Sequence, residues 1–108
     1  MIEIVYKGRD NPNVIIVKED GEPIDFTSTS RIVMSFEGTT VVADTWVDPN
    51  LVDWSQGDGI LEFHLNDLPI ESDDRLSVLL IAYDPLHPDG QVLAHPYSRV
   101  LQFRFIDA

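Results

Sequence analysis

Hydrophobic and polar residues alternate with a period of two along most of this chain, a pattern typical of β-strands that bury one face. In Arg31–Glu37, the apolar residues Ile32, Met34 and Phe36 occupy every second position. Ile60–Leu65 repeats the pattern. No segment sustains apolar residues at the i, i+3, i+4, i+7 spacing of a helix, so the sequence predicts an all-β protein.

Arg75–Asp84 is the longest segment of this kind and is apolar on both faces, which predicts a central strand. Gly38-Thr39 predicts a tight hairpin turn, and two polar loops are expected over Asp48–Gly59 and Asn66–Asp74, the second with room for a helical turn. The predicted strands are Ile2–Lys7, Asn13–Glu19, Ile24–Phe26, Arg31–Glu37, Thr40–Val47, Ile60–Leu65, Arg75–Asp84, Gln91–His95 and Tyr97–Asp107.

Composition favours the same fold class. Valine, isoleucine and threonine together number 26, against four alanines, and β-branched side chains prefer strands. Prolines and glycines punctuate the chain at the spacing of a sandwich or barrel. We expect one domain over residues 1–108, an immunoglobulin-like antiparallel β-sandwich of seven to nine strands, with a small β-barrel as the alternative. The expected core residues are Phe36, Leu61, Phe63, Leu80, Leu101, Phe103 and Phe105.

The charge balance limits the classes of partner. Nineteen acidic and seven basic residues give a net charge of -12. Nucleic acids and anionic membranes both attract basic surfaces, so neither is expected to bind this chain. The longest strongly apolar run, Val78–Tyr83, is far shorter than the roughly 20 residues of a membrane-spanning helix, and no signal-peptide pattern is present. We therefore expect a soluble protein made in the cytoplasm.

The residues of common catalytic and metal sites are absent or scattered. There is no cysteine, and His64, His87 and His95 lie in separate segments. No serine lies in a nucleophile-elbow motif. Acidic loop residues can bind hard cations, but no segment has calcium-loop spacing, and aspartate is a common turn residue. We therefore predict no enzyme, no catalytic residue, no metal site and no cofactor. The clustered loop acids are Asp48, Asp53, Asp58, Asp67, Glu71, Asp73, Asp74, Asp84 and Asp89.

Aromatic residues in or near loops are the candidate interaction residues. Trp46 alternates with Val42 and Asp44, which places it on a strand facing solvent or a neighbouring subunit. Trp54 follows Asp53 in a polar loop, where it either contacts a ligand or folds back as a lid on the core. Exposed aromatic side chains bind sugars or proteins through a large rigid surface. The candidate interaction residues are Trp46, Asp53, Trp54 and Tyr97.

An ordered set of segments carries a family resemblance. Val17–Phe26 holds a D-G-x-P turn before I-D-F, and the strand Ile32–Glu37 follows. Next come Asp53-Trp54-Ser55 and Gly59–Leu65, and last Leu79–Pro85 ahead of an H-P-D-G turn. Across residues 14–106 the chain resembles small proteins encoded in tail-gene regions of tailed bacteriophages and prophages. It is also similar to the N-terminal β-sandwich domain of phage baseplate upper proteins, but it lacks their long C-terminal region.

The resemblance implies a non-catalytic structural component of a phage tail or baseplate tip, located in the virion and present in repeated copies beside other virion proteins. Two other functions remain open at this point. A carbohydrate-binding or adhesin-like sandwich would stack sugars on Trp46, Trp54 or Tyr97. An acidic phage-encoded inhibitor would use the net charge of -12 to bind a basic host protein.

Overall fold

Eleven β-strands and no helix form the regular structure of residues 2–71 and 73–108, the part of the chain that this computed structural model describes. The all-β prediction is confirmed. The strand number exceeds seven to nine because several elements have only two residues. The strands are β1 (Ile2–Tyr6), β2 (Asn13–Ile16), β3 (Lys18–Glu19), β4 (Glu22–Pro23), β5 (Arg31–Phe36), β6 (Val42–Asp44), β7 (Val52–Asp53), β8 (Ile60–Phe63), β9 (Arg75–Asp84), β10 (His87–Ala94) and β11 (Gln102–Ile106).

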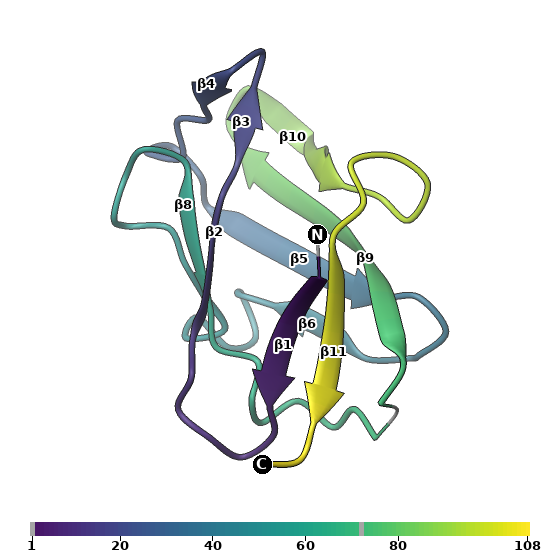
Figure 1. Cartoon of the computed structure of the whole chain (residues 1–108). Helices are drawn as coiled ribbons and strands as arrows, with labels where there is room; N and C mark the ends of the chain where they lie inside the picture. Colours follow the sequence, from purple (N-terminus) through teal and green to yellow (C-terminus); the bar gives the residue numbers. More distant parts are fainter. Residues whose placement is uncertain (1, 72) are drawn as a thin grey trace.

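Strand β9 organises the larger of two facing sheets (Figure 1). It pairs with β5 along residues 78–83 on one side. On its other side, residues 75–77 pair with β11, and the second half of the strand pairs with β10. The sheet order is β1-β11-β9-β5-β6, with β10 attached to β9. The sequence prediction of a long central strand at Arg75–Asp84 is therefore confirmed.

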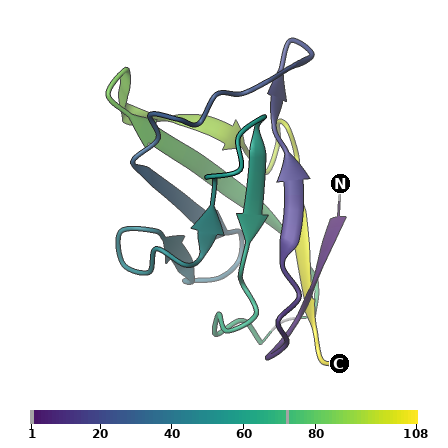
Figure 2. The ribbon, with the colours of Figure 1, turned by 90° about the vertical axis from the view of Figure 1, so that its left-hand side faces the viewer.

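The smaller sheet has the order β2-β8-β7, and β3 and β4 form a separate hairpin. Figure 2 looks toward β2 and β8 with strands of the larger sheet behind them. Both sheets turn one face inward, since buried and half-buried residues alternate along β5, β8 and β9. The arrangement is a two-layer β-sandwich.

A cluster of phenylalanines fills the space between the sheets. The ring of Phe63 in β8 meets Phe103 in β11 edge-to-face, with 5.5 Å between ring centroids. Phe36 in β5 meets both Phe103 and Phe105 in the same way, at 6.2 and 5.6 Å. Edge-to-face pairs of this geometry add to the stabilisation that burial already supplies. All seven core residues expected from the sequence are buried.

One pairing departs from the antiparallel expectation. The first strand, β1, runs parallel to the last, β11, with Ile2 beside Gln102 and Tyr6 beside Ile106. After β1 the chain crosses to the smaller sheet, where it forms β2, so β1 and β2 do not form a hairpin. The larger sheet is therefore mixed, with its parallel pair at one edge.

Three predicted strand boundaries were wrong, each because local hydrogen bonds turn the chain. Ile24–Phe26 is irregular, and the Asp25 carboxylate accepts bonds from the N–H and hydroxyl of Thr27. The predicted strand Thr40–Val47 contains only β6, because the Asp44 carbonyl accepts bonds from two following N–H groups. The segment before β11 is a turn closed by paired bonds between His95 and Ser98.

Three other segments also differ from the prediction. The H-P-D-G segment is the start of β10 and not a turn, so the predicted strand Gln91–His95 begins earlier, at His87. Asn13–Glu19 is divided at Val17 into β2 and β3. The predicted polar loop 48–59 contains the two-residue strand β7, in which Val52 is buried opposite Phe63. The described residues of the loop 66–74 form turns and no helix.

Replacing Phe63 or Phe103 with alanine should lower the free energy of unfolding by about 3–5 kcal/mol, because each change leaves a cavity in the cluster that joins the sheets. Urea unfolding monitored by tryptophan fluorescence measures this change. The control is Val47→Ala, which removes an exposed apolar side chain and should change stability by less than about 0.5 kcal/mol. A loss below about 1 kcal/mol at both phenylalanines would contradict the assigned core.

Candidate functional site

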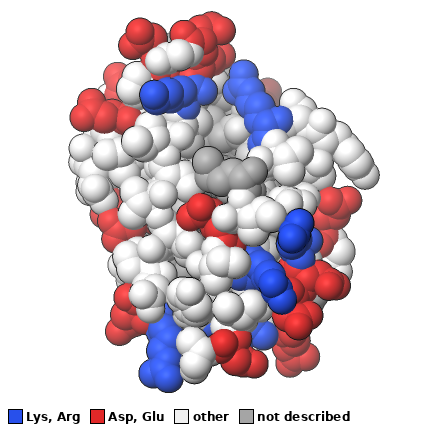
Figure 3. Space-filling view, viewed as in Figure 1, with Lys and Arg blue, Asp and Glu red and all other residues white. Residues whose placement is uncertain are grey.

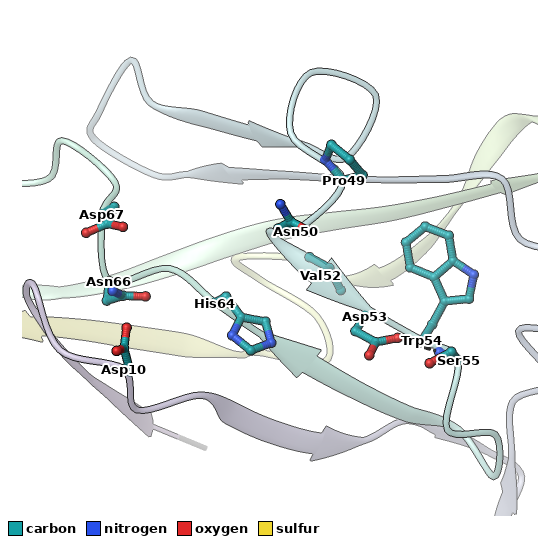
Figure 4. A pocket seen from close by; sticks show the side chains of 10 residues that line it. All are labelled: Asp10, Pro49, Asn50, Val52, Asp53, Trp54, Ser55, His64, Asn66 and Asp67. Atoms are coloured by element: carbon teal, nitrogen blue, oxygen red, sulfur yellow. Dashed lines mark hydrogen bonds between the residues drawn. The ribbon is translucent and has the colours of Figure 1, made fainter.

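A surface hollow of about 610 Å³ lies beside β7 and β8 and contains two of the candidate residues, Asp53 and Trp54 (Figure 4). Its lining mixes carboxylates, side-chain amides and an imidazole. Such groups can hydrogen-bond a polar ligand, so the positions of the side chains decide what the hollow can bind. The lining residues are Asp10, Pro49, Asn50, Val52, Asp53, Trp54, Ser55, His64, Asn66 and Asp67.

Asp53 and His64 lie on the outer face of the smaller sheet. Asp53 follows the buried Val52, and its carboxylate accepts a 2.8 Å bond from the Ser55 N–H. The side chain and then the N–H of Ser55 lower the pKa of Asp53, with a smaller contribution from His64. The His64 Nε2 lies 3.0 Å from a Glu62 carboxylate oxygen. Local partners therefore occupy these polar groups.

Trp54 points to the opposite side of β7 from Asp53 and His64 (Figure 4). Successive residues of a strand face opposite sides of the sheet. Trp54 is half-buried and packs against the hydrophobic core, so the lid interpretation of this residue agrees with its contacts. Asp53 and Trp54 therefore do not form a joint surface for a stacked sugar.

The positions of the histidine and acidic side chains bear on metal binding and nucleophilic catalysis. Within residues 2–71 and 73–108, no group of three or more histidine or acidic side chains is placed to hold a metal ion. His87 bonds Asp84, and His95 Nδ1 accepts a bond from the Tyr97 N–H. Among the described residues, no histidine has a hydrogen bond with a hydroxyl group, which is the contact that a serine nucleophile needs.

A second aromatic environment is the Arg31 cluster, which consists of Arg31, Asp44, Trp46 and Tyr83. The Arg31 guanidinium lies 4.2 Å from the centroid of the Trp46 ring and 5.2 Å from that of Tyr83. Its Nε and terminal nitrogens donate to the two Asp44 oxygens at 3.0 and 2.5 Å. This combination of a two-point ion pair and ring stacking suits a guanidinium better than an ammonium group.

Strand register builds this cluster. Arg31 is directly opposite Tyr83 in the β5–β9 pair, and Asp44 lies at the end of β6 beside Val33. Trp46 lies in the turn after β6, not on a strand as predicted. Its backbone N–H donates to Asp44 and its indole Nε1 donates to the Ser30 carbonyl at 3.2 Å. Trp46 is 66% exposed and is nevertheless held in a defined position.

Around this cluster, the outward side of the larger sheet carries an apolar stripe. Val33 is paired with Ile81, which is paired with Val92, and Ser35 separates Leu79 from Val42 in the next row. Val42 and Val92 are exposed, and the other apolar members are half-buried. We call this surface the outer apolar face. It comprises Val33, Val42, Leu79, Ile81 and Val92, with the Arg31 cluster at one end.

The contacts of Tyr97 differ from those of both tryptophans. It is 84% exposed in the turn between β10 and β11, and its ring centroid lies 5.7 Å from that of His95. Trp46 stacks on Arg31, whereas Trp54 packs on the core. The described contacts therefore place the three candidate aromatics in three separate environments.

Sequence reasoning missed Arg31 and Tyr83. Arg31 occurs at the outward position of a strand otherwise rich in apolar residues, which was the available signal. Its partners depend on the register of β5 with β6 and with the distant strand β9, and alternation alone does not define that register.

Comparison with known proteins gave no match: no family model, no curated protein and no solved structure matches this chain. Within the described residues, no helix is long and apolar enough to cross a membrane.

The Arg31–Asp44 pair should make stability depend on pH. The Arg31 hydrogen bonds lower the pKa of Asp44 below its ordinary value of 3.8, with the Trp46 N–H contributing and burial opposing. A carboxylate with a lowered pKa in the folded state stabilises the protein above its unfolded pKa, and this stabilisation disappears as the pH falls through the folded pKa. Wild-type stability should therefore fall between about pH 5 and pH 2 more steeply than that of Asp44→Asn.

Urea unfolding at a series of pH values measures this difference. The control is Asp89→Asn, which removes an exposed carboxylate that forms none of the ion pairs of the described residues. Equal pH slopes for wild type and Asp44→Asn would show that the pair does not contribute.

Proposed function

We propose that the protein is a non-catalytic structural component of a bacteriophage tail or baseplate-tip region, which binds neighbouring virion proteins through the outer apolar face. The observation that supports this proposal most is the Arg31 cluster beside exposed apolar residues. Tryptophan, tyrosine and arginine are the residue types most enriched among energetic hot spots of protein interfaces. Here all three are in one cluster.

The electrostatics of this face also favour protein binding. The chain has a net charge of -12, yet the central rows of the outer apolar face carry valine, leucine, isoleucine and serine. Arg31 and Asp44 neutralise each other at its end. A partner therefore covers apolar side chains without removing unpaired charges from water, which is the costly step in forming an interface.

A preorganised Trp46 lowers the cost of binding further. Ordering a mobile side chain on association opposes binding. Hydrogen bonds from the backbone and indole of Trp46, together with the stacked guanidinium, already hold this side chain in the free protein. It can contribute contact area with little additional loss of entropy.

The virion setting comes from the resemblance of residues 14–106 to phage tail-region proteins. Repeated copies, each contacting a neighbour through the same face, fit a tail or baseplate. The proposed location is therefore the virion, after synthesis in the host bacterial cytoplasm. The carbohydrate-binding alternative has less support, since Trp46, Trp54 and Tyr97 lie in separate environments.

Mass spectrometry of purified phage particles tests the proposal. Wild-type protein should be present in multiple copies per particle, and the double variant V42E/W46A should fall at least about tenfold in occupancy because it loses a hot-spot ring and gains a charge on the interface. Circular dichroism checks that both proteins fold. Tyr97→Ser removes an exposed aromatic from another environment and should leave occupancy unchanged.

Two results would count against the proposal. The protein could be absent from particles and recovered from infected cells in complex with a host protein, which would favour the inhibitor function. Alternatively, V42E/W46A could be incorporated as well as wild type, which would exclude the outer apolar face as the contact.

A further inference from the structure

A second surface, on a different side of the molecule, has the features of a strand-binding groove. A groove of about 380 Å³ separates β2 and β3 from the segment that joins β10 to β11. Its buried base is apolar and includes Leu80, Leu93 and Leu101. Figure 3 views the side of the molecule that carries β2 and β11. Much of this surface is uncharged, and acidic side chains lie mostly toward the outline of the molecule.

Strand β2 forms one wall of this groove and is the edge of its sheet. The His64 N–H donates to the Leu51 carbonyl on the β7 side, and the Val17 N–H donates to the Gly59 carbonyl on the β2 side. In an antiparallel pair, every second residue forms the hydrogen bonds between the strands. Because Val17 bonds to Gly59 and Ile15 lies opposite Leu61, the residues of β2 that bond to β8 are Asn13 and Ile15. The N–H and C=O groups of the alternate residues, Val14 and Ile16, therefore point away from β8.

Strand β1 covers one end of this edge. The Asn13 side-chain nitrogen donates to the Ile4 carbonyl at 2.8 Å, which ties the start of β2 to β1. From Ile15 onward, the strand borders the groove. Ile16 is 55% exposed, and Val100 is exposed on the opposite wall. A free edge with apolar side chains is a template for pairing with another strand.

Charge at the groove indicates what kind of strand fits. Lys18 and Arg99 line opposite walls, and neither takes part in the ion pairs of the described residues. Arg99 has a φ of 54°, a left-handed conformation that is uncommon for arginine. Glu19 and Asp20 also line the groove, where the chain enters the β3–β4 turn. A ligand carboxylate is therefore favoured between the two basic residues and disfavoured toward the turn.

We propose that this groove binds an extended segment of a partner protein by β-strand addition to β2. Backbone groups of the segment pair with the N–H and C=O groups of Ile16, where β2 borders the groove. An apolar side chain of the segment enters the groove above Leu80 and Leu101, and a carboxylate lies between Lys18 and Arg99. The site uses none of the residues of the outer apolar face, so it goes beyond the proposed function and can fail independently of it.

Selection of a random dodecapeptide library on the immobilised full-length chain provides the probe. Enriched peptides should alternate apolar and polar residues and carry an aspartate or glutamate at a recurring position. One enriched peptide, synthesised with a fluorescent label, then gives the Kd by anisotropy. On binding, hydrogen exchange measured by mass spectrometry should slow in residues 13–20.

Three variants locate the site. Ile16→Pro removes an N–H that faces the free edge and leaves the β2–β8 bonds in place, so it should raise the Kd at least tenfold while the fold is retained. The charge reversal K18E/R99E leaves the backbone unchanged and should also raise the Kd at least tenfold, with a loss of the salt dependence of binding. Arg75→Glu reverses one basic charge outside the groove and should leave the Kd within twofold.

The proposal is overturned if no peptide is enriched, or if bound peptide protects residues outside the groove. It also fails if a folded Ile16→Pro protein and K18E/R99E both bind as tightly as wild type. V42E/W46A should bind the peptide normally, so that loss of particle incorporation and loss of peptide binding remain separate results.

Discussion

The edge-to-face packing of Phe36, Phe63 and Phe103 is the interaction on which the rest of the structure depends. Phe63 is the member that comes from the smaller sheet, and its contact with Phe103 fixes how β8 lies across β11. Phe36 transmits the same constraint to β5. Because β5 and β11 both pair with β9, the rings define the position of the central strand as well. The outward residues of β5 and β9 then lie in register, which allows the Arg31 cluster to form.

The alternation of apolar residues was enough to predict the buried faces. The expected core, including Phe36, Leu61 and Phe105, agrees with the structure because burial on one side of a strand requires a period of two. Element ends were less predictable. Asp44 ends β6 by accepting hydrogen bonds from the residues that follow it. In the sequence, an aspartate that ends a strand in this way looks the same as any other aspartate. β7 was missed because two residues are too few to show a period.

The candidate surfaces depended on pairing, which the sequence does not encode locally. Trp46 was correctly singled out as an exposed aromatic, but its partner Arg31 is brought to it by the β5–β6 register. Trp54 precedes a polar stretch of sequence, yet its side chain packs against the core. The free edge of β2 follows from the sheet order, which determines the strands that have two neighbours and the strands that have one.

The parallel pairing of β1 with β11 has a mechanical consequence. The two strands run in the same direction, and Ile2 and Ile106 lie at opposite ends of the pair (Figure 1). Tension applied between these two residues slides one strand along the other, so the hydrogen bonds between them are loaded together and in shear. Peeling the strands apart would load the same bonds one after another. Forced unfolding is governed by the unfolding rate and not by equilibrium stability. The same short pair of strands should therefore resist tension along its axis better than tension that peels it apart.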